Sequence, residues 1–410
     1  MYDYVIVGGG ISGLYMYMNL LQKTSNICLL EKNDYFGGRI KQCNDKISGK
    51  NISFPEGAAR FNNNHKKVIK LLKQFNLFDS QKTPNVSSDI DFIDTENEFS
   101  NKFNGENGFK YINKILEKYH KYDKQELQNM TFQELGQKIL KKTELEFMLK
   151  SSGYTGQLKN MNSYDAIHLF DKGIRVDMKY YVGVFPKLID NLLLYLHKHN
   201  ANLKLKINVT DIINKDETYD IYIKDKIIHS KNVICCTPKF SLLKFSCMSP
   251  IKELLEKSIT CKPLCRVYAV FDDNDIWFEN LKKKIVVNNQ LRYIIPIDVK
   301  KGLIMISYTD DVYTKYWNKM NNNQSKLKKS VVKLVNKTFD IDINEPRKVY
   351  VCHWDCGVAY WNKKVDSISV SNQITNPIDN LFICGENYSR TQSWVEGALE
   401  SCDRCLKVCI

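Results

Sequence analysis

The chain has 410 residues, of which 43 % are hydrophobic and 26 % are charged. At about 150 residues per domain this length predicts two or three domains, and the composition excludes a disordered, collagen-like or low-complexity chain. No apolar run reaches the roughly 20 residues that a membrane-spanning helix needs. The net charge is +14. Because the basic residues form only short, separate runs, we interpret this charge as solvated surface and predict no nucleic-acid or membrane site.

Thirteen cysteines are scattered along the chain. Their odd number, and a predicted strand that begins almost at residue 1, argue against disulfide bonds and against a secretory signal. We therefore expect an intracellular, cytoplasmic protein with reduced thiols. Cys402 and Cys405 have the spacing of a redox or metal pair, but no second pair accompanies them. They are interpreted as buried thiols, and no metal site is predicted.

The first thirty residues have the pattern of a strand, a turn, a helix and a second strand. Residues 4–7 are a mostly β-branched run followed by three glycines, residues 11–21 are rich in Leu and Met, and residues 26–30 are a second apolar run. A strand, a helix and a strand this close together predict the start of a parallel sheet.

Further elements are expected along the rest of the chain. Residues 65–78 have apolar positions at helical spacing, and residues 85–180 are polar, rich in Asn and Lys, and mostly helical in pattern. The remaining expected elements are helices from Pro186, near 324–337 and over 395–408, and short strands over 203–209, 219–223, 226–228, 232–236 and 381–384.

A G-x-G-x-x-G pattern lies between the first strand and the first helix, at Gly8, Gly10 and Gly13. Gly8 permits the tight turn, Gly10 lets the backbone approach a pyrophosphate, and Gly13 lets the helix pack closely on the strand. The helix would begin at Ile11 and Ser12 and direct its positive end at the phosphates. The pattern therefore predicts a dinucleotide site.

Glu31 ends the second strand and is followed by Lys32. A carboxylate in this place binds ribose hydroxyls, and its charge disfavours the 2′-phosphate of NADP. The segment that follows, residues 31–39, closes on Gly38 and Arg39 after Gly37.

Residues 31–39 resemble the segment that follows the ribose acid in FAD-dependent amine oxidases. Residues 381–389 and 394–401 are similar to that family's C-terminal flavin motif. The resemblance implies that Gly385 lets the backbone pass the ribityl chain and that Glu386 accepts its hydroxyl protons. It also implies a helix, begun near Ala398, whose positive end stabilises the reduced flavin.

Two middle segments, residues 208–212 and 232–238, also resemble the family, in which a valine backbone contacts the adenine and a strand ends in Thr-Pro or Val-Pro. Non-covalent FAD is the expected cofactor. The residues expected to bind it are Gly8, Gly10, Ile11, Ser12, Gly13, Glu31, Lys32, Gly38, Arg39, Gly57, Ala58, Ala59, Arg60, Val209, Thr237, Gly385, Glu386, Trp394, Val395 and Ala398.

Residues 55–65 resemble the stretch of L-amino-acid oxidases in which a glycine, two small residues and an arginine precede a histidine. In that branch the arginine holds the substrate carboxylate, so the resemblance assigns this role to Arg60. A planar guanidinium meets a carboxylate with two parallel hydrogen bonds and fixes the α-carbon. A flavin-phosphate or structural role for Arg60 stays open, and His65 is interpreted as a packing residue or helix start.

One departure from the family lies at Arg266, where members usually carry a lysine that holds a water near flavin N5. Arginine can hydrogen-bond a water but cannot relay a proton. The substitution leaves open whether O₂ or another acceptor takes the electrons.

Aromatic residues precede the C-terminal motif where the family places the walls of its substrate cage. Tyr360, Trp361 and Trp394 are the expected walls, with plain core packing as the alternative. Covalent attachment of the flavin at Cys356 is not predicted, because Asp-Cys-Gly lacks the surroundings that attachment has in monoamine oxidases.

The predicted fold is α/β, with a discontinuous Rossmann-type FAD-binding domain and a mixed-sheet substrate domain that carries a helical insertion. The expected boundaries are 1–84, 200–248 and 372–410 for the first domain, 249–371 for the second and 85–199 for the insertion. A homodimer is an open possibility.

The expected activity is oxidation of an amine, with an L-amino acid as the expected substrate, by hydride transfer to flavin N5. H₂O₂ would form if O₂ is the acceptor. The alternatives are a polyamine or monoamine oxidase, a flavin-binding protein without turnover, and a desaturase or isomerase on the same scaffold.

Overall fold

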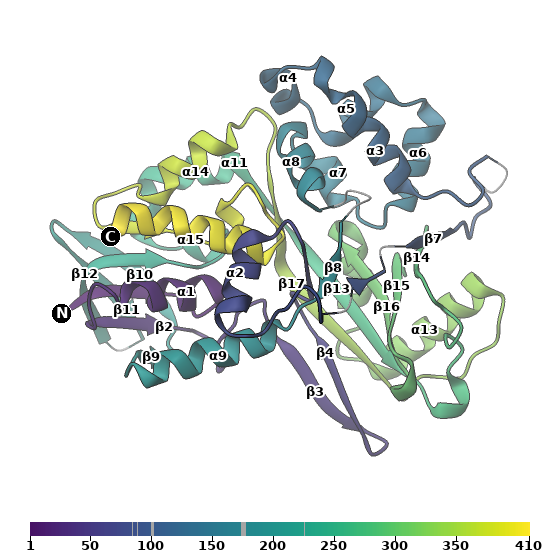
Figure 1. Ribbon diagram of the computed structural model, residues 1–410, viewed down its shortest axis with the longest axis horizontal. Helices are drawn as coiled ribbons and strands as arrows, with labels where there is room; N and C mark the ends of the chain where they lie inside the picture. Colours follow the sequence, from purple (N-terminus) through teal and green to yellow (C-terminus); the bar gives the residue numbers. More distant parts are fainter. Residues whose placement is uncertain (84, 88, 100–101, 174–177, 225) are drawn as a thin grey trace.

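The computed structural model describes residues 1–410 except 84, 88, 100–101, 174–177 and 225. Two large sheets lie side by side, and a unit of short helices sits above the right-hand sheet (Figure 1). The left part of the molecule holds both termini, and the chain crosses between the two parts several times.

The first sheet has β1 (Tyr2–Val7) at its centre, paired in parallel with β2 (Ile27–Leu30) and β12 (Lys226–Cys235). The other strands of this sheet are β9 (Asn202–Lys204), β10 (Val209–Lys215), β11 (Thr218–Ile223) and β18 (Leu381–Ile383). Strands from three distant stretches thus share one sheet. Strand β2 and residues 4–7 of β1 are apolar and buried because both of their faces are covered.

Four helices pack into one hydrophobic core with this sheet: α1 (Ile11–Leu20), α2 (Lys66–Gln74), α9 (Phe185–Lys198) and α15 (Val395–Cys409). The two ends of the chain meet here, since the Tyr4 hydroxyl donates to the Cys409 carbonyl at 2.7 Å. Helix α9 falls within the expected 85–199 insertion, yet it packs on α1. Its apolar face, which includes Leu188, Leu192 and Leu196, packs in the same hydrophobic core as α1.

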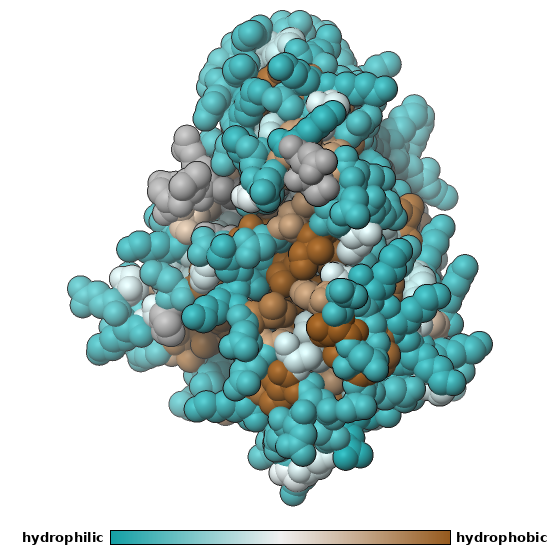
Figure 2. Space-filling model, turned by 90° about the vertical axis from the view of Figure 1, so that its right-hand side faces the viewer, coloured by the Kyte–Doolittle hydropathy of each residue, from teal (hydrophilic) through white to brown (hydrophobic). Residues whose placement is uncertain are grey.

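The second sheet has the strand order β17 (Lys348–Trp361), β13 (Ile259–Val270), β16 (Leu303–Asp310), β15 (Tyr293–Asp298), β14 (Lys284–Val287) and β7 (Ile90–Ile93). Helices α12 (Thr314–Asn318) and α13 (Gln324–Phe339) cover one face. The hairpin β3 (Gln42–Ile47) and β4 (Lys50–Pro55) packs on the other. Figure 2 views the molecule from the right-hand side of Figure 1. Apolar residues there form a band that runs down the middle of a hydrophilic face.

The helical unit comprises α3 (Gly108–Lys118), α4 (Lys124–Asn129), α5 (Phe132–Ile139), α6 (Lys142–Ser151), α7 (Gly156–Asn160) and α8 (Ser163–Gly173). Such short helices need their ends capped. At α5, Thr131 and Glu134 exchange side-chain to backbone hydrogen bonds in a capping box. The remaining elements are β5 (Arg60–Asn62), β6 (Asn85–Val86), β8 (Tyr180–Val182), α10 (Lys239–Leu242), α11 (Lys252–Ser258) and α14 (Ser367–Thr375).

Some elements differ from the sequence-based expectation. The strands expected over 226–228 and 232–236 are one strand, β12. The polar residues between them also pair with the neighbouring strands, since Ser230 pairs with both Tyr2 and Tyr219. The strand expected over 203–209 is divided between β9 and β10. Within the described part of the chain, no helix combines the length and apolar character that crossing a bilayer requires.

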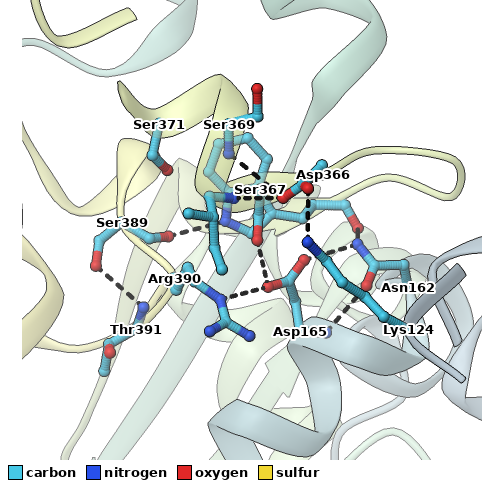
Figure 3. A network of polar contacts seen from close by, with 12 residues as sticks. Lys124, Asn162, Asp165, Asp366, Ser367, Ser369, Ser371, Ser389, Arg390 and Thr391 are labelled. Atoms are coloured by element: carbon cyan, nitrogen blue, oxygen red, sulfur yellow. Dashed lines mark hydrogen bonds and ion pairs between the residues drawn. The ribbon is translucent and has the colours of Figure 1, made fainter. Parts of the chain in front are cut away.

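A buried carboxylate joins the helical unit to the C-terminal segment. Asp165 of α8 is fully buried and accepts hydrogen bonds from Asn162, from the Ser367 hydroxyl at 2.6 Å and from Nε of Arg390 at 3.0 Å (Figure 3). Asn162 also donates to the Trp361 carbonyl. The network therefore fixes the loop before α15 to two neighbouring elements.

We predict that Asp165→Asn lowers the free energy of unfolding by about 3 kcal/mol, because it leaves the partly buried Arg390 without its anion. Thermal or denaturant unfolding measures this. Ser369→Ala is the control, since Ser369 is exposed and only its backbone N–H enters the network. Equal stability of the two variants would contradict the prediction.

Candidate active site

A cleft of about 850 Å³ lies where the two sheets and the helical unit meet. Its size suits a large organic ligand. Residues from all three expected parts of the chain line it. Among the residues expected to bind FAD, the cleft is lined by Gly8, Gly10, Ile11, Ser12, Glu31, Lys32, Gly38, Arg39, Gly57, Ala58, Ala59, Arg60, Val209, Thr237, Gly385, Glu386, Trp394, Val395 and Ala398, and Gly13 lies behind it.

The three motif glycines have different surroundings. Gly8 has a φ of +108°, and a Cβ there would lie 2.8 Å from the Cys236 carbonyl oxygen. A Cβ on Gly13 would overlap the carbonyl oxygen of Gly8. On Gly10 it would meet no protein atom closer than 3.9 Å. Gly8 and Gly13 are therefore required by the turn and its packing, whereas Gly10 keeps space free in the cleft.

Helix α1 begins at the floor of the cleft. Its N-cap is Gly10, so no side chain caps it, and its first turn holds no acidic residue. The first backbone N–H groups of a helix have no partner within it, and they carry partial positive charge. With Ile11 and Ser12 in the cleft wall, this helix end can bind a pyrophosphate.

Glu31 lies at the carboxyl end of β2 and is only 5 % exposed. Its two carboxylate oxygens accept the N–H groups of Gly9 at 2.7 Å and Asn33 at 2.8 Å. Each oxygen retains a lone pair for a further donor. The acid is thus held in place by the backbone and can receive ribose hydroxyls.

Glu386 is the second acid of the cleft, and it is 6 % exposed. It pairs with the Arg39 guanidinium at 2.8 Å, and it also accepts from the Asn387 amide and the Ser393 N–H. Arg39 and Glu386 therefore lie together in the wall of the cleft, although 347 residues separate them in sequence.

Two further features suit a bound flavin. The Thr237 hydroxyl, in the cleft wall, is buried and has no hydrogen-bond partner. Gly385 has a φ of +145°, and a Cβ there would meet only the Tyr388 ring, at 3.6 Å. The Thr237 hydroxyl is thus free to bind a polar ligand, and the backbone at Gly385 leaves space for one.

Helix α15 also begins at the cleft, at Val395, with no side-chain cap. Glu396, the acidic residue of its first turn, accepts the N–H groups of Lys67 and Val68 at the start of α2. The carboxylate therefore caps α2, and the positive end of α15 is left to the cleft.

The far end of the cleft holds Arg60, Arg266 and three tyrosines, Tyr154, Tyr308 and Tyr360. Tyr154 and Tyr308 were not expected from the sequence. The register of the second sheet sets Tyr308 opposite Arg266, so a correct strand pairing would have revealed it. Tyr154 comes from the loop between α6 and α7, within residues 85–180, where none of the segments that resemble the family lies.

Neither arginine of this end contacts an acidic side chain among the described residues. Arg60 lies 5.4 Å from the Tyr180 ring centroid. Burial disfavours its charged form, but the neighbouring tyrosines outweigh burial and raise its pKa. Arg266 is 6 % exposed, donates to the Tyr308 hydroxyl and the Pro55 carbonyl at 3.4 Å each, and its Nε has no partner.

The charge of these arginines acts on Tyr308. Burial alone would raise the pKa of this phenol, but the positive charge and hydrogen bond of Arg266, together with the charge of Arg60, outweigh burial and lower it. Burial, with the Arg60 charge, lowers the pKa of Lys284 to about 8. The charges of Arg60 and Arg266 therefore act together on this end of the cleft.

The structure separates the three expected aromatic walls. Tyr360 and Trp394 line the cleft. Trp361 does not, and its role as a cage wall was wrong: it is fully buried and donates to the Ser389 carbonyl at 2.9 Å. Successive residues of a strand face opposite sides, so Tyr360 and Trp361 cannot both face the cleft. His65 packs edge-on against Trp394, with ring centroids 4.6 Å apart.

The chain matches a family model over residues 11–405, under the description flavin-containing amine oxidoreductase. Because the match covers nearly the whole chain, the protein belongs to this family. It is therefore a flavin-dependent oxidoreductase, and the cleft described above is suited to the flavin. No protein of curated function matches the chain.

We predict that Gly10→Ala weakens flavin binding at least about tenfold without lowering the melting temperature of the apoprotein, because its methyl group enters only the cleft. Gly13→Ala is the matched variant, and it should destabilise the apoprotein because its methyl group meets Gly8. Fluorescence titration with FAD and thermal unfolding separate the two effects. Normal flavin affinity in Gly10→Ala would show that the cofactor lies elsewhere.

His65 gives a pH prediction. Burial lowers its pKa to about 3, whereas a histidine of the unfolded chain titrates near 6.5. The unfolded state therefore binds the extra proton first, so the stability present above pH 6.5 is lost as the pH falls toward 3, by up to about 1.4 kcal/mol per pH unit. His65→Asn should lose less stability than wild type between pH 7 and 5 in thermal unfolding. If both proteins lose the same stability between pH 7 and 5, His65 is not the source of the pH dependence.

Proposed function

We propose that the protein is an FAD-dependent enzyme that oxidises the amine of an amino acid to an imine. The observation that carries the proposal is Arg60, a guanidinium in the wall of the cleft with no acidic partner among the described residues. Leaving such a charge unpaired is costly, so its natural partner is an anionic group of the substrate.

Several features support FAD as the flavin. The cleft begins at the uncapped N-terminus of α1 and at Glu31, which suit a pyrophosphate and a ribose, and it continues past Thr237 and Gly385 to Arg60. A mononucleotide flavin would leave the first part without a ligand. We expect the cofactor to be held without a covalent bond.

The residues at the far end of the cleft would bind and orient the substrate. Arg60 would hold the α-carboxylate through two parallel hydrogen bonds and so fix the amine-bearing carbon. Tyr154, Tyr308 and Tyr360 would wall the site and exclude water. A bound flavin supplies the acceptor for the two electrons removed from the amine carbon. The released imine hydrolyses in water to a keto acid and ammonia.

Arg266 is the residue on which the electron acceptor depends in this proposal. Its guanidinium has more N–H groups than the two that donate to Pro55 and Tyr308, and a spare one can hold a water in the cleft, but an arginine cannot pass on a proton. O₂, with H₂O₂ as product, and a different acceptor are both compatible with this arrangement.

The charge of the cleft disfavours a polyamine substrate. Arg60, Arg266 and the nearby Lys284 would repel a second or third ammonium group of the substrate. Comparing turnover of amino acids with turnover of spermine distinguishes the two activities. A bound flavin that no amine reduces under anaerobic conditions would instead favour a protein without turnover.

We predict that Arg60→Met raises KM for an amino acid at least about 100-fold, the loss of one charge-assisted bidentate contact. Activity on an amine without a carboxylate should change little. Arg60→Lys keeps the charge but not the planar fork, so its KM for the amino acid should lie between those of wild type and Arg60→Met. Steady-state kinetics with an amino acid and its decarboxylated analogue test this. Equal losses on both would contradict the role of Arg60 as a carboxylate site.

A further inference from the structure

A second guanidinium faces the same end of the cleft as Arg60. Arg266 lies in β13, lines the cleft and is 6 % exposed. Its guanidinium carbon lies 4.6 Å from the centroid of the Tyr308 ring. Its hydrogen bonds to Tyr308 and to Pro55 are long, at 3.4 Å, and Nε makes none. These neutral partners leave most of its charge uncompensated.

The acids that line the cleft are Glu31, Asp310, Asp355 and Glu386, and each has other partners: Glu31 accepts backbone N–H groups of Gly9 and Asn33, and the exposed Asp355 lies 3.2 Å from His353. Asp310 accepts the N–H groups of Thr155 and Gly156, and burial raises its pKa. Glu386 pairs with Arg39. Lys284, which is 8 % exposed, adds positive charge near Arg60. Two guanidinium groups thus face one cavity without an anion from the described chain.

We infer that the substrate carries two anionic groups and is a dicarboxylic amino acid. The α-carboxylate binds Arg60, as in the proposed function on which this inference rests, and the side-chain carboxylate binds Arg266. Tyr308 lies beside Arg266, and its hydroxyl can donate a further hydrogen bond to the same carboxylate. Both guanidinium groups of the cleft then have an anion, and the site selects against neutral and cationic side chains.

Non-reactive acids test the inference without turnover. The ligands are succinate, glutarate and adipate, each compared with the monocarboxylate of the same number of carbons, and their affinity for the flavin-loaded protein is measured by calorimetry. We expect one of the diacids to bind at least 30-fold more tightly than its monocarboxylate. The preferred chain length reports the separation of the two arginines.

Two variants assign the second contact. Arg266→Met should weaken diacid binding far more than monocarboxylate binding and so abolish the preference for the diacid, whereas Arg266→Lys should keep part of the preference. In turnover, wild type should have a lower KM for glutamate or aspartate than for the matching amide, glutamine or asparagine. The wild-type comparisons hold even if a variant fails to fold.

The outcomes separate this inference from the proposed function. Equal binding of diacids and monocarboxylates by wild type, with loss of both in Arg60→Met, overturns the second anion site alone and leaves Arg266 as a water-binding residue. If no carboxylate binds, or if Arg60→Met has no effect on any of them, both proposals fail.

Discussion

The contact between helix α1 and strand β1 governs the nucleotide end of the cleft. Helix and strand meet so closely at Gly13 that a Cβ there would overlap the Gly8 carbonyl. This closeness directs the uncapped end of α1 at the carboxyl edge of the parallel strands, where Glu31 and Thr237 also lie. Ligands of α/β sheets bind at such an edge because helix ends and strand ends converge there. The remaining elements enclose this edge with a second sheet and a helical unit.

Uncompensated positive charge governs the other end of the cleft. Burying a guanidinium without an anion is unfavourable, and this chain buries Arg266 and places Arg60 beside it among tyrosines. In the proposed function an anionic substrate would compensate this charge, and its binding would stabilise the folded site. The network of Asp165 and Arg390 shows the opposite arrangement, a buried acid that is fully satisfied and joins three elements.

Much of the nucleotide end could be predicted from the sequence, because glycine spacing and strand–helix alternation are local properties. The family match over residues 11–405 confirms the amine oxidoreductase assignment and the flavin class. The substrate end was predicted less completely. Tyr154 and Tyr308 were missed, and Trp361 was placed in the cleft although it lies in the core, because which side a strand residue faces depends on register.

The sequence by itself determined the turn at Gly8, the helix end at Gly10 and the acid at Glu31, since each follows from short-range sterics and hydrogen bonding. Only the tertiary structure decided which residues share the far end of the cleft. Arg60, Arg266, Tyr154 and Tyr308 come from four separate segments, and their meeting depends on strand register and on packing between the sheet and the helical unit. Whether a guanidinium has an acidic neighbour depends on the whole fold. That Arg60 and Arg266 have no acidic partner among the described residues could therefore be recognised only from the tertiary structure.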